Sequence, residues 1–167
     1  MREDASFRRS ALIHHGFCGW VRFKALLAEP QQVPATGGVY VVLRDSARPP
    51  EFLSTNPGGR FKGRDPTVPV EALRANWVVG AEVIYIGKAN DLRRRLGEFC
   101  KFGVGRPIGH WGGRLIWQLA DSATLLVAWK ETPVDVVPRA AESELIARFR
   151  TLYEKPPFAN SPHLLGR

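Results

Sequence analysis

VIYIGKANDLRRRL, residues 83–96, is the stretch that decides the fold, because a strand pattern passes directly into a helix pattern. The apolar run at residues 83–86 predicts a buried strand that stops at Gly87. Asn90 or Asp91 is suited to cap the helix that follows, whose apolar positions have the spacing of one helical face. The stretch therefore predicts a strand-to-helix unit of an α/β protein.

Other segments extend this pattern in both directions. Residues 39–43 and 123–130 are apolar runs typical of buried strands. Residues 17–29 predict an N-terminal helix, and residues 138–153 predict a last helix. Residues 114–119 fit a strand or a helix equally well. The order is strand, long connection, strand, helix, loop, strand, helix, which indicates one small α/β domain.

The connection between the first two strands is unusually long. Residues 44–76 contain several prolines and glycines and scattered charges, a composition that predicts irregular structure. We therefore expect a domain over residues 37–167 with an insertion at about residues 44–81. Residues 1–36 are expected to form an arm with a helix packed on that core.

The composition favours an anionic partner. Lys and Arg outnumber Asp and Glu by 24 to 16, which gives a formal charge of +8. Charge alone fits a nucleic-acid enzyme and a basic scaffold equally well. Cys18 and Cys100 lack the spacing of a zinc site and predict a reduced, cytoplasmic compartment. No apolar stretch reaches the length of a membrane span, so we expect no membrane partner.

Two charged residues are placed where they could face inward. Glu142 continues the apolar stripe of the last predicted helix, where a carboxylate is costly unless a cation meets it. A salt bridge to an arginine would explain Glu142 without catalysis. Arg95 adjoins the apolar side of its own helix, although an arginine-rich helix is also typical of a solvated or phosphate-facing surface.

The two strand tyrosines, Tyr40 and Tyr85, indicate a function only in combination with Glu142 and Arg95. Gly38-Val39-Tyr40 and Tyr85-Ile86-Gly87 resemble the two signature strands of the GIY-YIG nuclease family. The continuation through Lys88 to Arg95 is similar to the repair-nuclease branch of that family. The helix segment at Glu142 and the closing Asn160 also match in order and type. The resemblance covers about residues 37–160.

The resemblance implies a fold, a cofactor and a site. The fold would be α/β, a small, mainly antiparallel sheet flanked by helices. The activity would be hydrolysis of a phosphodiester bond with Mg²⁺ or Mn²⁺ held by Glu142. Tyr40, with Tyr85 as its partner, would orient or deprotonate the attacking water; either tyrosine or a metal-bound hydroxide could be the base. Arg95 would bind phosphate oxygens. The positions that match the family's catalytic residues are Tyr40, Tyr85, Lys88, Arg95, Glu142 and Asn160.

Basic and aromatic residues outside this set are candidates for contacts with the substrate backbone and bases. They are Arg60, Lys62, Arg64, Arg93, Arg94, Lys101, Arg106, His110, Trp111 and Arg114. The alternative is that the tryptophans at 111 and 117 belong to the core. Two departures from the family are plain: 45 positions separate Tyr40 from Tyr85, and Phe99 stands where many members have His or Tyr.

We therefore expect a metal-dependent endonuclease that acts on DNA. Two alternatives remain: a non-catalytic module that only binds nucleic acid, and a nuclease that cleaves RNA. A chain of this length has no room for a large recognition domain, so specificity would come from the insertion or from a partner protein.

Overall fold

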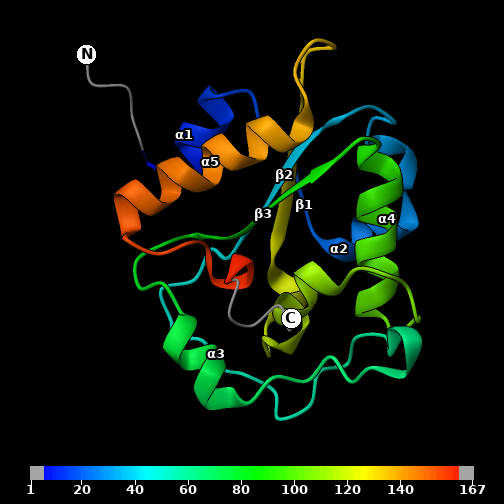
Figure 1. Cartoon of the computed structure of the whole chain (residues 1–167), viewed down its shortest axis with the longest axis vertical. Coiled ribbons are helices and arrows are strands. Elements are labelled where there is room, and N and C mark those ends of the chain that lie inside the picture. Colours follow the sequence, from blue (N-terminus) through cyan, green and yellow to red (C-terminus); the bar gives the residue numbers. More distant parts are fainter. Residues whose placement is uncertain (1–5, 162–167) are drawn as a thin grey trace.

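The structure is a computed structural model that describes residues 6–161. Its centre is a four-stranded sheet with the order β1-β4-β2-β3, in which every neighbouring pair is antiparallel (Figure 1). The strands are β1 (Cys18–Val21), β2 (Gly38–Leu43), β3 (Val83–Ala89) and β4 (Leu126–Glu131). Because β3 lies at the end of this order, one of its edges has no strand partner among residues 6–161.

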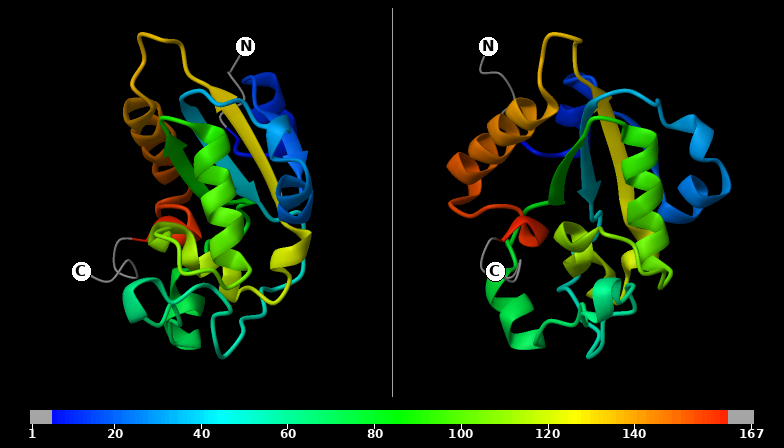
Figure 2. Two further views of the ribbon diagram at one scale, coloured as in Figure 1. Left: turned by 90° about the vertical axis from the view of Figure 1, so that its right-hand side faces the viewer. Right: turned by 45° about the vertical axis from the view of Figure 1, so that its right-hand side comes forward.

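Helices cover both faces of the sheet (Figures 1 and 2). One face packs against α1 (Arg9–His14) and α5 (Pro138–Tyr153), and its core includes Val39, Val41 and Phe149. The other face packs against α2 (Phe23–Ala28) and α4 (Leu92–Gly103), together with the short turns of 3-10 helix at Trp111–Gln118. The alternation of side chains along β2 divides these two cores, as expected for a strand buried on both faces.

The segment that joins β2 to β3 contains α3 (Val70–Asn76) and a 3-10 turn at Phe61–Gly63. Buried polar side chains fix it to the rest of the domain. The Gln118 amide accepts a hydrogen bond from the Val68 N–H at 2.9 Å and donates to the Val68 and Leu53 carbonyls. Arg44 is buried and forms an ion pair with Asp121 at 2.8 Å. The segment is therefore ordered by side-chain contacts more than by regular structure.

The remaining 3-10 turns are Pro30–Gln32, Ser122–Thr124 and Phe158–Asn160. The last of these lies close to β3 (Figure 1). Within residues 6–161, no helix combines the length and apolar character needed to cross a bilayer.

The α/β class, the antiparallel sheet and the helix over residues 138–153 are confirmed. The helix predicted over residues 17–29 is wrong in its first half, which forms β1 and pairs with β4. The apolar spacing suited a helix, but hydrogen bonds to a strand distant in sequence override it. β3 also continues through Gly87 to Ala89, and β4 begins only at Leu126.

Candidate active site

A cleft of about 300 Å³ lies at the free edge of β3. α4 and α5 pack on opposite faces of the sheet and both contribute side chains to it, so the cleft wraps around this edge. Its lining residues are Tyr40, Tyr85, Lys88, Ala89, Asn90, Asp91, Arg94, Arg95, Glu98 and Glu142. All but one of the predicted catalytic residues therefore meet in one place.

The two tyrosines form the floor of the cleft on the α4 side. Tyr40 is 1% exposed and Tyr85 is 7% exposed, and their ring centroids lie 5.9 Å apart. The strand register places Gly87 directly opposite Tyr40, and a Cβ atom at Gly87 would overlap the Tyr40 phenol. Gly87 is thus the residue that lets the tyrosine lie flat across β3.

Burial raises the pKa of both phenols. Desolvation is the main cause for each, and the neighbouring Tyr85 raises the pKa of Tyr40 further, while the Arg95 cation opposes the shift. The pKa of Tyr40 lies well above the ordinary value. Both hydroxyls are consequently protonated at neutral pH and can donate hydrogen bonds.

Gly38 has a second steric role at the start of β2. A Cβ atom at Gly38 would overlap the Lys130 carbonyl of β4 and meet the Leu92 side chain at 2.7 Å. The absence of a side chain therefore allows the N-terminus of α4 to pack closely on β2. That end of the helix is capped by the Asp91 carboxylate, which accepts a hydrogen bond from the Arg94 N–H at 2.9 Å.

Arg95 extends from α4 toward the cleft and is held by two acceptors. Its Nη1 donates to the Glu98 carboxylate at 3.3 Å and to the Gly109 carbonyl at 3.2 Å. Its side chain remains 32% exposed, so an incoming phosphate can reach it. Glu98 was not among the sequence candidates; its position three residues after Arg95 was the available signal.

Glu142 projects from α5 and is half-buried. Desolvation raises the pKa of its carboxyl group, and the nearby Lys88 and Arg139 cations oppose that shift. Among the described residues, its carboxylate has no ion pair within 4.0 Å. The alternative of a direct salt bridge to an arginine is therefore not seen.

Glu142 is the residue at the cleft that could hold a hard divalent cation. No three His, Cys, Asp or Glu side chains within residues 6–161 gather into a complete protein cage. Mg²⁺ commonly takes one or two carboxylates and keeps several waters, so a single carboxylate beside a polar cleft fits that mode of binding.

Asn160 does not line the cleft. Its Oδ1 accepts a hydrogen bond from the Ile86 N–H at 2.9 Å, and its Nδ2 donates to the Ile86 carbonyl at 2.8 Å. Among the described residues, the Asn160 side chain is therefore hydrogen-bonded to the backbone of β3. Asn160 supports the site indirectly, by fixing the strand that carries Tyr85.

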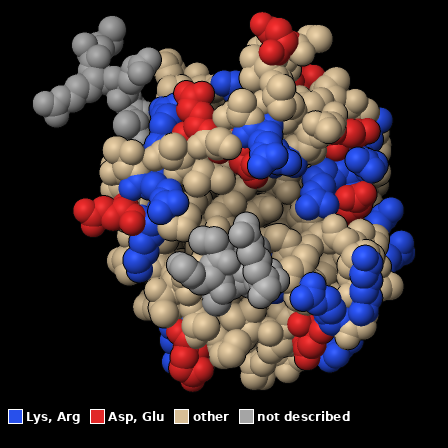
Figure 3. All heavy atoms as spheres, viewed as in Figure 1, with Lys and Arg blue, Asp and Glu red and all other residues tan. Residues whose placement is uncertain are grey.

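The basic candidates divide into exposed and buried groups. Side chains that are solvent-exposed are Arg60, Lys62, Arg64, Arg93, Arg94, Lys101 and Arg106. On the face that Figure 3 shows, which is viewed as in Figure 1, Lys and Arg side chains lie on several sides of the central hollow. Arg93 nevertheless turns to the Val33 carbonyl, to which it donates at 2.7 Å.

The aromatic loop differs from its prediction as a base-stacking surface. His110 is 0% exposed and packs against Phe99 with the rings tilted at 44° and a centroid distance of 4.2 Å, so it cannot contact a base in this conformation. Arg114 is also buried. Trp111 is half-buried, and the guanidinium groups of Arg64 and Arg114 lie 5.2 and 4.6 Å from its ring centroid. His110 is thus buried by packing against α4, a contact that the local sequence of the loop does not predict.

Comparison with models of known protein families gives no match, and neither do comparisons with curated proteins or with solved structures. The chemistry of the cleft residues is consequently the ground on which a function is assigned.

Proposed function

We propose that the protein is a metal-dependent endonuclease of the GIY-YIG type that hydrolyses phosphodiester bonds of DNA. The observation that carries the proposal is the convergence of Tyr40, Arg95 and Glu142 on one cleft, although they come from three elements. A protein that only binds nucleic acid has no use for Glu142, because an unpaired carboxylate repels phosphate.

Substrate phosphate would bind on the α4 side of the cleft. Arg95 has a planar guanidinium that matches phosphate oxygens, and Arg94 adds a second, more exposed cation. Phosphate would compete with Glu98 for the Arg95 Nη1 atom. Lys88, a residue of β3, also lines the cleft and would neutralise phosphate charge from the side away from α4.

The tyrosines would orient water. Their raised pKa values leave both hydroxyls protonated, so in this environment neither phenol is a ready base. A protonated hydroxyl can still donate to a phosphate oxygen or hold a water in line for attack. We therefore assign Tyr40 and Tyr85 to positioning and to charge stabilisation.

Glu142 is the residue that would hold Mg²⁺ or Mn²⁺. When bound, such an ion supplies Lewis acidity at the phosphate and lowers the pKa of coordinated water. The cleft itself supplies the cations and hydroxyl donors that surround the reacting phosphate.

The DNA backbone would continue beyond the cleft toward the 3-10 turn at residues 61–63. The Gly59 backbone packs closely on that of Arg106, and Arg64 lies over Trp111. The exposed cations Arg60, Lys62 and Arg106 therefore belong to one connected part of the surface. Phosphates on either side of the scissile bond could be bound there.

The test uses supercoiled plasmid and the full chain with Mg²⁺ or Mn²⁺. Glu142→Gln preserves side-chain size and removes the charge, and should lower the rate of nicking by about a hundredfold or more, the scale of losing transition-state charge stabilisation. Glu71→Gln, an exposed carboxylate on α3, is the matched control and should cut normally.

Three results would overturn parts of the proposal. Cutting of RNA without cutting of DNA would reassign the substrate. Binding of DNA without cutting in either metal would favour the non-catalytic module. Equal activity of Glu142→Gln and the unchanged protein would remove Glu142 from the mechanism.

A further inference from the structure

A second cavity of about 230 Å³ lies between α1, α5 and the end of β4. It belongs to the sheet face that α1 and α5 cover, and it shares no lining residue with the candidate active site. Eight of its fifteen lining residues are apolar, among them Leu12, Phe17, Val39 and Leu145, and the other seven are polar or charged. We name it the α1–α5 cavity.

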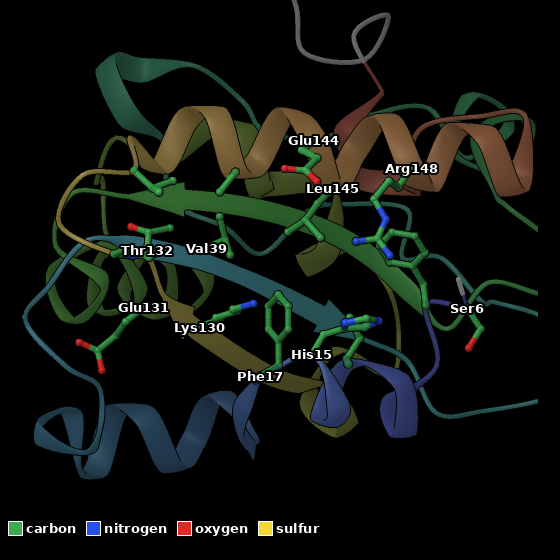
Figure 4. Close-up of a pocket in the computed structure, with 15 residues that line it drawn as sticks. Ser6, His15, Phe17, Val39, Lys130, Glu131, Thr132, Glu144, Leu145 and Arg148 are labelled. Atoms are coloured by element: carbon green, nitrogen blue, oxygen red, sulfur yellow. The ribbon is translucent and has the colours of Figure 1, made fainter. Parts of the chain in front are cut away.

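Cationic and imidazole groups meet in this cavity from three different elements. Figure 4 shows Lys130 coming from β4, Arg148 from α5 and His15 from the end of α1. Neither Lys130 nor Arg148 forms an ion pair with a described residue. The His15 Nε2 atom is buried and has no hydrogen-bond partner in the described part of the chain.

Lys130 and Arg148 are solvent-exposed, so of these three groups only the buried His15 Nε2 atom is costly to leave without a partner. A buried polar atom without a hydrogen bond destabilises the folded state. Apolar walls with a few convergent polar groups are, by contrast, the usual composition of a ligand pocket. The α1–α5 cavity therefore has the features of a binding site and lacks the satisfied polar contacts of a structural interior.

The two carboxylates that line the cavity do not cancel its cations. Glu131 accepts a hydrogen bond from the Thr36 hydroxyl at 2.6 Å and points away from the other labelled side chains (Figure 4). Glu144 is exposed on α5 and makes no ion pair with Arg148 four residues later. The side of the cavity on which the exposed Lys130 and Arg148 lie consequently favours an anion.

We propose that the α1–α5 cavity binds a small organic acid that has one carboxylate on a compact apolar body. Its volume sets the size, because an apolar cavity of about 150 Å³ holds benzene and the remaining space is enough for one charged group. Lys130 and Arg148 would bind the carboxylate, His15 Nε2 would supply one more polar contact, and Phe17 would pack on the apolar body. This proposal does not depend on the nuclease function.

Benzoate is the probe, with benzamide as its uncharged counterpart. Binding to the ¹⁵N-labelled full chain would be followed by amide chemical shifts. We expect benzoate to shift amides around Phe17, Val39 and Leu145, and benzamide to bind at least about tenfold more weakly, the scale of one charged hydrogen bond.

Matched variants test the residue assignments. Arg148→Met and Lys130→Met should each weaken benzoate binding by about tenfold or more, whereas Arg150→Met, which removes an exposed arginine of the same helix, should not. Glu144→Gln should retain or strengthen binding. Leu145→Phe keeps every charge but fills the space, and should abolish it.

The outcomes that overturn the proposal are distinct. Absence of benzoate shifts, equal binding of benzamide, or unchanged binding in the double variant of Lys130 and Arg148 would each refute it. Shifts centred on Arg95 would show that the anion prefers the candidate active site, and would refute it as well. Loss of plasmid cutting has no bearing on any of these measurements.

Discussion

At the scale of single residues, His110 is a titratable group that folding removes from water. It is fully buried, neither ring nitrogen has a hydrogen-bond partner among the described residues, and desolvation lowers its pKa to about 3, with the Arg95 cation contributing. The imidazole is therefore neutral in the folded protein at any ordinary pH.

This burial gives stability a defined pH dependence. In the unfolded chain His110 takes up a proton near pH 6.5, whereas the folded state does so only near pH 3. As the pH falls between these values, the free energy of unfolding should decrease by about 1.4 kcal/mol per pH unit from this group. Relative to His110→Phe, the unchanged protein should lose about 2 kcal/mol between pH 6.5 and pH 5.

Urea unfolding at several pH values measures this difference. His14→Gln, which removes an exposed histidine, should follow the unchanged protein across the series. A gap between His110→Phe and the unchanged protein that stays constant with pH would contradict the assigned burial of the imidazole.

At the scale of elements, the same added methyl group should have opposite effects in β3 and in α4. Gly87→Ala places a Cβ against the Tyr40 ring and should reduce the free energy of unfolding by about 1–3 kcal/mol, as overpacking does. Gly97→Ala, inside α4 with nothing within 4 Å, should increase it by about 0.5–1 kcal/mol. Chemical denaturation of both variants provides the comparison, and a stable Gly87→Ala protein would disprove the close contact.

The elements also show what a sequence can and cannot predict. The helix over residues 138–153 and the cap at Asp91 depend on local signals, and both are as predicted. β1 depends on pairing with β4. Its register is irregular, with Trp20 at a φ of 58°, and no local sequence pattern predicts this irregularity. Strand pairing across a hundred residues is not visible in side-chain periodicity.

In the candidate site, too, some features could be predicted from the sequence and others depend on tertiary contacts. Tyr40, Arg95 and Glu142 were predicted through a motif, and the structure brings them to one cleft. The bonds of Asn160 to Ile86 and the burial of His110 depend on tertiary contacts that residue type does not encode. The motif thus predicted candidates that line one cleft, but not that Asn160 would bond to β3 outside it or that His110 would be buried.

At the scale of the whole molecule, the formal charge of +8 should make DNA binding strongly dependent on salt. Lys101→Gln removes an exposed cation of α4, and should reduce the slope of log affinity against log salt by about 1. Arg9→Gln on α1, which lies on the far side from the face in Figure 1, should leave the slope unchanged.

Fluorescence anisotropy of a labelled duplex, recorded in EDTA so that no cutting occurs, gives both slopes. Equal slopes for the two variants would place the DNA outside the region around α4.

The hydrogen bonds between Asn160 and Ile86 have a consequence for how copies of this protein meet. The outer edge of β3 is the kind of edge on which another chain could add as a further strand. Because Asn160 occupies both the N–H and the carbonyl of Ile86, the middle of that edge offers no free pair to an incoming backbone. The chain thus keeps a cleft beside the outer edge of β3 while discouraging the sheet extension that leads to aggregation.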